Sequence, residues 1–258
     1  MPNKKIKFID LSLPIESVPS DPEFMIPQIE YTDHRGGLVS VQELLGCAPE
    51  DLPLGLGWAV EKVVLSTHSG THLDAPWHYA PVSEGKKAKT IDQIPLEWCY
   101  GNGVVLDFRR KKDGSLITVE DLEKALRKIH YKIKPRDIVL IMTGADRYWG
   151  KPEYLVKGCG MGRESTFWLI DRGVKVVGID AWSWDRPLPF LKKEFQEEKD
   201  ATILWAAHFA GIEKEYLHME KMANLSKLPP HGFTLICFPV KIRSASAGWV
   251  RPVAIVRG

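Results

Sequence analysis

Short apolar runs alternate along the chain with segments in which apolar residues recur at helical spacing. Strands are predicted over residues 5–12, 58–67, 103–108, 137–143, 174–179, 233–240 and 250–256. A helix is predicted from Thr118, whose capping-box partner is Asp121, to about Ile129, and two more over residues 164–171 and after Asp200. Strands that alternate with helices predict an α/β fold with a mixed, partly parallel sheet flanked by helices.

Residues 14–57 break this pattern, because they are rich in proline, glycine and acidic residues. They predict a long irregular excursion with a short helix near residues 41–45. Long loops of this kind are often lids or pocket walls. No internal repeat or obvious linker divides the chain, so a single domain is predicted over residues 1–258.

Composition narrows the class of protein without naming its chemistry. The 258 residues are 44% hydrophobic and 26% charged with a net charge of +2, so neither nucleic acid nor a membrane surface is an expected partner. No apolar run approaches the roughly 18 residues of a membrane span, and the first residues show no signal peptide. The four cysteines form no Cys-x-x-Cys pair, so a reduced, cytoplasmic setting is expected. The weak net charge leaves a small-molecule substrate as the expected partner.

Four potential metal ligands fall within eleven residues, namely His68, His72, Asp74 and His78. Imidazole and carboxylate are the usual ligands of zinc, manganese or iron in catalytic sites. Gly70 and Pro76 make a regular helix through this stretch improbable, so it is interpreted as an extended segment or a loop. His72 and Asp74 then point to one side, and Gly70 allows the bend that brings His68 to the same ion. The alternative is a chance cluster of polar loop residues.

This segment resembles the His-x-Gly-Thr-His-x-Asp-x-Pro-x-His signature of the cyclase-like metal-dependent hydrolases, with every fixed position present. That family includes bacterial kynurenine formamidase and isatin hydrolase. Shorter similarities lie at residues 10–12, 143–150, 178–180, 241–242 and 251–254, so the resemblance covers nearly the whole chain. It implies a swivelling β/β/α fold and a homodimer or higher homo-oligomer.

The resemblance also implies further ligands in the later half of the chain. His208 and Glu220 have the family's separation of twelve positions, and Glu220 precedes Met222-Ala-Asn-Leu225. His218 and Glu213 lie close by as alternatives. One or two Zn²⁺ or Mn²⁺ ions are implied. His68, His72 and Asp74 would hold the first ion, and three residues would either hold a second ion or divide between ligation and proton transfer, namely His78, His208 and Glu220.

The implied reaction is hydrolysis of an amide carbonyl, in an aryl formamide or a cyclic amide, by water activated on the metal. His78 or Glu220 would supply the proton to the departing amine. The alternatives are a lactone hydrolase or cyclase and a non-catalytic metal- or ligand-binding relative on the same fold.

Aromatic residues near the predicted site suggest a substrate pocket for an aryl group. The candidates are Trp77, Tyr148, Trp182 and Trp184. Core filling is the equally weighted alternative for these side chains. Asp180 ends a predicted strand, where it would either orient a ligand histidine from behind or cap the following turn.

Overall fold

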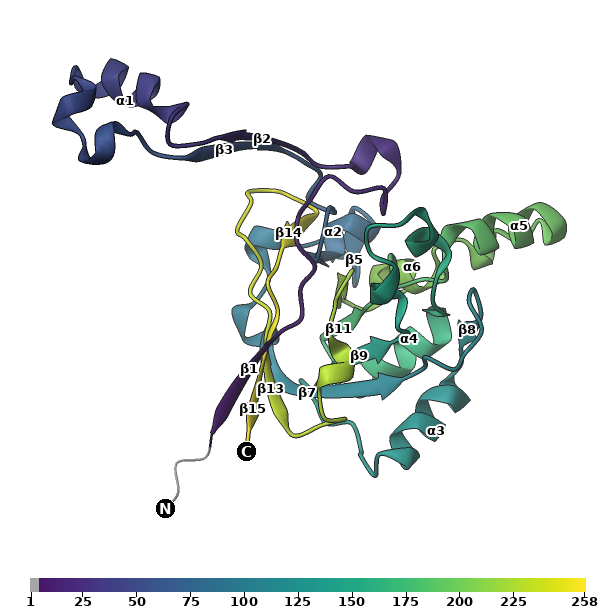
Figure 1. Cartoon of the computed structure of the whole chain (residues 1–258). Coiled ribbons are helices and arrows are strands. Elements are labelled where there is room, and N and C mark those ends of the chain that lie inside the picture. The colour runs from purple at the N-terminus through teal and green to yellow at the C-terminus, as the bar shows by residue number, and fades with distance from the viewer. Residues whose placement is uncertain (1–4) are drawn as a thin grey trace.

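A curled sheet of nine strands forms the body of the protein in a computed structural model that describes residues 5–258 (Figure 1). Its strands, in spatial order, are β1 (Ile6–Asp10), β15 (Val253–Arg257), β13 (Phe233–Ile236), β7 (Tyr100–Asp107), β9 (Ile138–Met142), β11 (Val176–Ile179), β12 (Leu217–Glu220), β4 (His72–Asp74) and β14 (Ala247–Trp249). The four strands β7, β9, β11 and β12 run parallel, and the flanking pairs are antiparallel. The predicted mixed α/β fold is confirmed.

Helices cover one face of the sheet beside its parallel strands (Figure 1). They are α2 (Pro76–Tyr79), α3 (Val119–Lys128), α4 (Arg163–Ile170) and α6 (Ala206–Glu213), while α5 (Leu188–Glu198) extends outward. The capping box that predicts α3 is present, since the Thr118 side chain accepts a hydrogen bond from the Asp121 amide. The helix α5 and the short strands β4, β12 and β14 were not predicted as separate elements.

The core lies on both faces of the sheet, and residues of β9 alternate between the two sides. Val139 and Ile141 pack in the cluster beneath the helices, whereas Ile138 and Leu140 pack in the cluster on the opposite face. A strand buried on both faces has a continuous apolar sequence, which is why the sequence of residues 137–143 predicted a strand. Within residues 5–258, no helix has the length and hydrophobicity needed to cross a membrane.

The predicted excursion of residues 14–57 is more regular than its composition suggested. Its strand β2 (Gln28–Thr32) pairs with β3 (Val60–Val64) in an antiparallel ribbon, and α1 (Gly37–Leu45) lies beyond them. The ribbon leads away from the body (Figure 1), and residues 28–64 are called the arm below. The strand predicted over residues 58–67 therefore forms, but it lies in the arm and outside the main sheet.

Two further pairs of short strands lie at the margins of the body. β5 (Val82–Ser83) pairs with β6 (Lys86–Lys87), and β8 (Leu116–Ile117) pairs in parallel with β10 (Gly160–Met161). In the chain, β8 directly precedes α3 and β10 directly precedes α4. Both strands line part of a cavity near the start of α4.

Candidate metal centre

The pairing of β4 with β12 places four polar side chains on one face of the sheet. His218 lies opposite Asp74, and Glu220 lies opposite His72. Directly opposed residues share a face, and residues two apart along a strand do so as well. The side chains of His72, Asp74 and His218 are fully buried, and Glu220 is nearly so. Register alone therefore brings residues 144 and 148 positions apart in the chain into one cluster.

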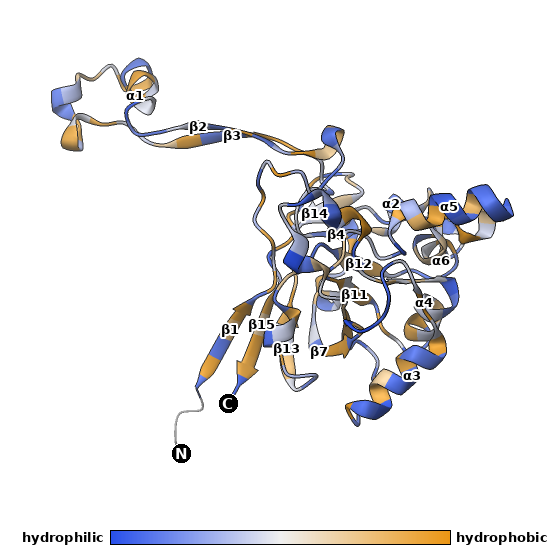
Figure 2. Ribbon diagram, turned by 45° about the vertical axis from the view of Figure 1, so that its right-hand side comes forward, coloured by the Kyte–Doolittle hydropathy of each residue, from blue (hydrophilic) through white to orange (hydrophobic). Residues whose placement is uncertain are grey.

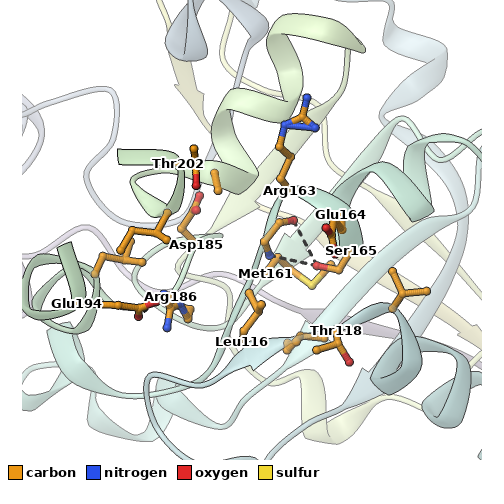
Figure 3. A pocket seen from close by; sticks show the side chains of 16 residues that line it. Leu116, Thr118, Met161, Arg163, Glu164, Ser165, Asp185, Arg186, Glu194 and Thr202 are labelled. Carbon is orange, nitrogen blue, oxygen red and sulfur yellow. Dashed lines mark hydrogen bonds and ion pairs between the residues drawn. The ribbon is translucent and has the colours of Figure 1, made fainter. Parts of the chain in front are cut away.

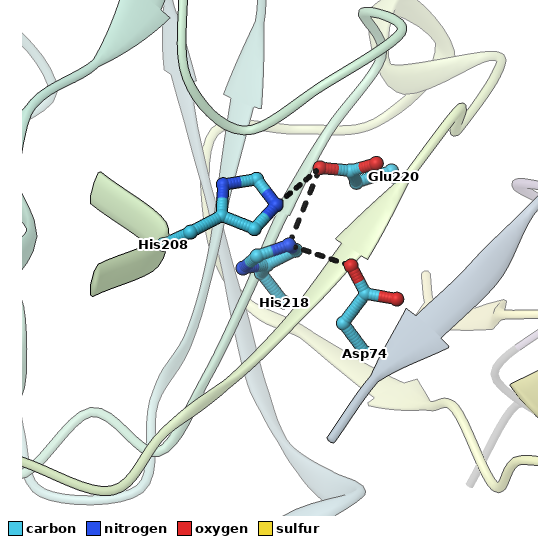
Figure 4. Close-up of side chains that lie close together, drawn as sticks. All are labelled: Asp74, His208, His218 and Glu220. Atoms are coloured by element: carbon cyan, nitrogen blue, oxygen red, sulfur yellow. Dashed lines mark ion pairs between the residues drawn. The ribbon is translucent and has the colours of Figure 1, made fainter. Parts of the chain in front are cut away.

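Nitrogen and carboxylate oxygen atoms converge at the centre of this cluster (Figure 4). His218 Nε2 lies 2.9 Å from Asp74 Oδ2 and 3.2 Å from Glu220 Oε1. His72 Nε2 lies 3.3 Å from Asp74 Oδ1. His208, which α6 supplies, places its Nε2 3.6 Å from Glu220 Oε1.

The remaining two histidines of the early segment approach Asp74 from its more open side. Gly70 has a φ of +59°, so the chain turns there and His68 Nδ1 comes within 2.9 Å of Asp74 Oδ1. His78 Nε2 lies 3.9 Å from Asp74 Oδ2. His78 sits on the one-turn helix α2, which begins at Pro76 because proline is tolerated in a first helical turn. The segment is extended over His72–Asp74, as predicted, and the one helical turn at Pro76–Tyr79 was not predicted.

The buried atoms of the cluster lack the hydrogen-bond partners that buried polar groups normally have. Within residues 5–258, His72 Nε2, both oxygens of Asp74 and His218 Nε2 have none of acceptable geometry. The other ring nitrogen is occupied in two cases, since His72 Nδ1 donates to the Gly70 carbonyl at 2.9 Å and His208 Nδ1 donates to Asp185 at 2.6 Å. Each Nε2 then carries a lone pair, as a metal ligand requires.

The electrostatics of the cluster fit a bound cation. Burial opposes ionisation of Asp74, but the surrounding imidazoles outweigh it and hold the pKa of its carboxyl well below the usual range. Burial likewise opposes ionisation of Glu220, yet the His218 imidazole helps to lower the pKa of Glu220 to about 2. Burial lowers the pKa of His218, but the two carboxylates overcome it and raise that pKa to about 9. A divalent cation would supply the positive charge that His218 otherwise has to carry.

The structure brings six predicted ligands together and adds a seventh. They are His68, His72, Asp74, His78, His208 and Glu220, and their roles as ligands remain predictions. The seventh is His218, which the sequence offered only as an alternative. Glu213 lies outside the cluster, because its side chain is 57% exposed and pairs with Arg163.

Comparison with known proteins identifies the family. The Cyclase family model matches residues 9–186, well over half of the chain. The chain belongs to this family. It is 30% identical over 207 residues to kynurenine formamidase of Erythrobacter litoralis, a match that covers 79% of this chain and 78% of the relative. It is 29% identical over 195 residues to kynurenine formamidase of Salinibacter ruber, covering 73% and 76%.

A solved structure shares the fold of this cyclase-family protein. Isatin hydrolase A from Ralstonia solanacearum superimposes with a TM-score of 0.73 at 23% sequence identity, over 97% of this chain and 92% of the other. The family resemblance expected from the His68–His78 segment is therefore confirmed.

In this cyclase-family protein the carboxylate that supports the candidate ligand His208 is Asp185. Of the two roles predicted for Asp180, orienting a ligand histidine was wrong, and holding a turn is closer to what the structure shows. Asp185 accepts hydrogen bonds from the His208 Nδ1 and from the amides of Ala207 and His208, which fixes the start of α6. Asp180 instead accepts bonds from the amides of Thr143 and Gly144, so it holds the turn after the neighbouring strand β9. Burial raises the pKa of Asp180 to about 7.

Trp184 does not form a pocket wall, contrary to the prediction. It is fully buried, its ring lies behind His218, and its Nε1 donates to Thr166 Oγ1 at 3.1 Å. Trp182 is partly buried and donates to Asp21 Oδ1 at 2.6 Å. Trp77 is 38% exposed, and Tyr148 packs beneath Lys157. Their binding of a substrate remains a prediction.

An aromatic residue that the sequence did not single out lies against the candidate ligands His78 and His208. The Trp205 ring stacks on His208 with centroids 4.5 Å apart and planes 5° apart, and it lies 5.4 Å from the His78 ring. Trp205 has a φ of +51°, a conformation that costs free energy in a bulky residue and recurs at functional sites. Only the structure reveals this wall of the site.

A separate cavity of about 590 Å³ lies beyond Asp185 (Figure 3). Its lining includes β8, β10, the start of α4 and part of α5. None of the seven clustered residues lines it. The candidate metal centre and this cavity are therefore distinct, with Asp185 between them.

Proposed function

We propose that this cyclase-family protein hydrolyses the carbon–nitrogen bond of a small amide, either an aryl formamide or a cyclic amide, with Zn²⁺ or Mn²⁺ as cofactor. The observation that carries the proposal is the convergence of buried, unpartnered ligand atoms from His72, Asp74 and His218. Relatives named kynurenine formamidase and a structural neighbour named isatin hydrolase support the amide class.

Two overlapping groups of side chains support one or two ions. Asp74, His208, His218 and Glu220 form one group, and His68, Asp74 and His78 form the other. His72 adjoins both through Asp74 and Glu220. When bound, a divalent ion lowers the pKa of a coordinated water and polarises a carbonyl oxygen.

The protein's own groups supply proton transfer and orientation. His78 is partly exposed and lies between Asp74 and Trp205, so it is placed to move a proton from the attacking water to the departing amine. Glu220 is the other candidate for this transfer, since its Oε1 accepts from the Trp184 amide at 2.8 Å while Oε2 faces His72. The flat Trp205 ring beside His78 favours a planar, aryl-bearing substrate.

The test combines metal analysis with a substrate screen on the purified protein. Metal content per chain is measured, and metal-replete and chelator-treated samples are assayed on N-formylkynurenine, a simple aryl formamide, isatin, a lactam and a lactone. We expect metal-dependent turnover of at least one aryl formamide or cyclic amide. Bound metal without turnover of any amide would overturn the proposal in favour of a binding protein, and turnover of the lactone alone would assign a lactonase. Full activity in strong chelator would exclude the metal mechanism.

A further inference from the structure

Basic side chains gather around another hollow of the body, which is called the basic pocket below. It has a volume of about 330 Å³. One acidic residue and four basic ones line it, namely Asp107, Arg109, Arg110, Lys128 and Arg147. The whole chain has a net charge of only +2, so the pocket is a local concentration of positive charge.

The basic pocket lies where two parallel strands of the main sheet end. Asp107 is the last residue of β7 and pairs in register with Met142, the last residue of β9. Arg109 follows β7, and Arg147 belongs to the turn that follows β9. Glu220 ends β12, another of the four parallel strands, so the pocket and the candidate metal centre share one edge of the sheet. The carboxyl ends of parallel strands are where α/β sheets commonly bind ligands.

The last turn of α3 supplies another side of the pocket. Figure 2 shows hydrophilic and apolar residues alternating along this helix. Its Leu122 and Leu126 are buried, whereas Lys128 is exposed. The hydrogen bond from Arg109, and to a smaller degree the charge of Lys128, lowers the pKa of Asp107. The ammonium group of Lys128 therefore acts on the same hollow as the arginines.

Two of the arginines converge over a glycine that leaves room for them. Gly144 has a φ of +77°, and a Cβ built there would lie 2.9 Å from Arg147 Nη2 and 3.3 Å from Arg109 Cγ. Arg147 Nε donates to the Gly144 carbonyl at 3.1 Å, which fixes the stem of that side chain. The position of the two arginines is therefore set by the turn and by its missing side chain.

Only part of the positive charge around the pocket is balanced. Asp107 accepts hydrogen bonds from Arg109 Nε at 2.9 Å and from Arg109 Nη2 at 2.7 Å. Within residues 5–258, the other three basic residues of the pocket take part in no ion pair, namely Arg110, Lys128 and Arg147. An anion is the group that would balance them.

Two carboxylates behind the arginines are already engaged by the backbone. Asp146 and Asp180 line a smaller space with Arg109 and Arg147, and neither of them lines the basic pocket. Asp180 holds the turn after β9, and Asp146 Oδ2 accepts from the Asn224 amide at 3.1 Å. The side of the arginines that faces the basic pocket is therefore left for a ligand.

These features favour a small ligand with a doubly charged anionic group. Guanidinium groups bind the oxygens of carboxylates and phosphates in bidentate pairs. Three unpaired cations attract a dianion more strongly than a single negative charge. The volume of the pocket is at the lower end of the roughly 300–1,000 Å³ of small-molecule sites. The weak net charge of the chain offers no extended basic track for a nucleic acid.

We propose that the basic pocket binds a small molecule through a dianionic group, a phosphate monoester or a dicarboxylate, held by Arg110, Lys128 and Arg147. The pocket is a second ligand site, since none of the seven residues clustered at the candidate metal centre lines it. The proposal does not depend on the reaction at that centre.

Calorimetric titration of the full-length protein tests the proposal. The probes are inorganic phosphate, glycerol 3-phosphate and malonate, with chloride at the same ionic strength as the reference. At least one dianion should bind, and Arg110→Gln with Arg147→Gln should raise its Kd at least tenfold. Lys192→Gln with Lys193→Gln on α5 removes the same charge elsewhere, so it is the matched control and should leave the Kd unchanged. No binding beyond that of chloride would overturn the proposal, and so would binding that the arginine variant leaves unchanged.

The same titrations identify the kind of ligand. Tighter binding of glycerol 3-phosphate than of malonate would assign a phosphate monoester, and the reverse order would assign a dicarboxylate. Arg110 and Arg147 are exposed, so their variants should keep the melting temperature of the unaltered protein. A DNA oligonucleotide that binds through the same arginines more tightly than every small anion would overturn the assignment of a small ligand.

Discussion

The antiparallel pairs β2–β3 and β4–β12 have opposite surroundings, although β3 and β4 follow each other in sequence. β3 ends at Val64 and β4 begins at His72, so only a short turn separates them. The pair β4 and β12 is buried on every residue, whereas β3 is exposed on every residue. Both pairs have regular ladders. Backbone pairing therefore decides neither burial nor function in this molecule.

Each strand pair has chemical groups without a partner. The kind of group, polar atom or apolar side chain, indicates which partner it would bind. The buried pair leaves nitrogen and oxygen atoms of His72, Asp74 and His218 unpartnered, which calls for a cation. The exposed pair leaves apolar side chains such as Val60 and Val63 in water, which calls for another protein surface.

Removal of His218 should abolish the metal centre. His218→Ala takes an imidazole from between Asp74 and Glu220, so metal affinity and activity should fall by more than the roughly 10–100-fold that loss of a supporting group costs. Metal per chain after dialysis and kcat are the measurements. Glu213→Gln, on the neighbouring exposed carboxylate, is the control and should leave both unchanged. Retention of metal by His218→Ala would exclude it as a ligand.

A buried ion pair joins the centre to the segment before the arm, and breaking it should destabilise the fold. Lys221 directly follows Glu220, and its Nζ donates to Asp21 and, at 2.9 Å, to the His68 carbonyl. Both charged side chains are almost wholly buried. Lys221→Met leaves Asp21 as an uncompensated charge, which should lower the free energy of unfolding by about 3–5 kcal/mol.

Urea denaturation of the single and double variants measures this effect. Lys221→Met with Asp21→Asn removes both charges, so it should recover much of the lost stability. If the double variant were as unstable as the sum of the single ones, the two side chains would not act as a pair.

The early half of the centre was predictable from sequence because its determinants are local. Gly70 permits a turn, and alternation in extended chain sends His72 and Asp74 to one side, as the structure shows. His218 could not be ranked above Glu213, because its place depends on the register of the short strand β12 against β4. That register is fixed by strands far away in the sequence.

The wrong choice of Asp180 as the support of a ligand histidine has the same origin. Asp180 and Asp185 both follow β11, and the sequence cannot tell which carboxylate faces α6. In the arm, the sequence predicted the strand correctly but not its surroundings. Val60, Val63 and Val64 have the apolar pattern of a buried strand, and the pattern does not say whether a sheet or solvent surrounds it. The apolar sequence pattern predicts a strand, but only the tertiary structure determines what packs against that strand.

Substitution of Asp185 should weaken the centre without dismantling it. Asp185→Asn keeps the shape but removes the charge that holds the His208 Nδ1 proton, so metal affinity should fall by roughly 10–100-fold. Titration with Zn²⁺ or Mn²⁺ in a competing chelator measures this affinity. Asp180→Asn is the matched control, since it is equally buried but holds the turn at Thr143. An equal loss of metal affinity in both variants would mean that general destabilisation, and not support of His208, is the cause.

The smallest effect should come from the tip of the arm, and its dependence on concentration is what matters. Leu54 is 92% exposed, so Leu54→Ala should change the free energy of unfolding of the dilute monomer by no more than about 0.5 kcal/mol. By contrast, Leu73→Ala, between His72 and Asp74 on β4, should cost about 2–5 kcal/mol at any concentration, because Leu73 is fully buried. If a second copy covers the arm, the stability of the unaltered chain should rise with concentration, since dimer formation stabilises the folded state by mass action. The stability of the Leu54→Ala variant should then rise less. Thermal unfolding at concentrations 100-fold apart measures this difference, and equal melting shifts at both would show that Leu54 meets only water.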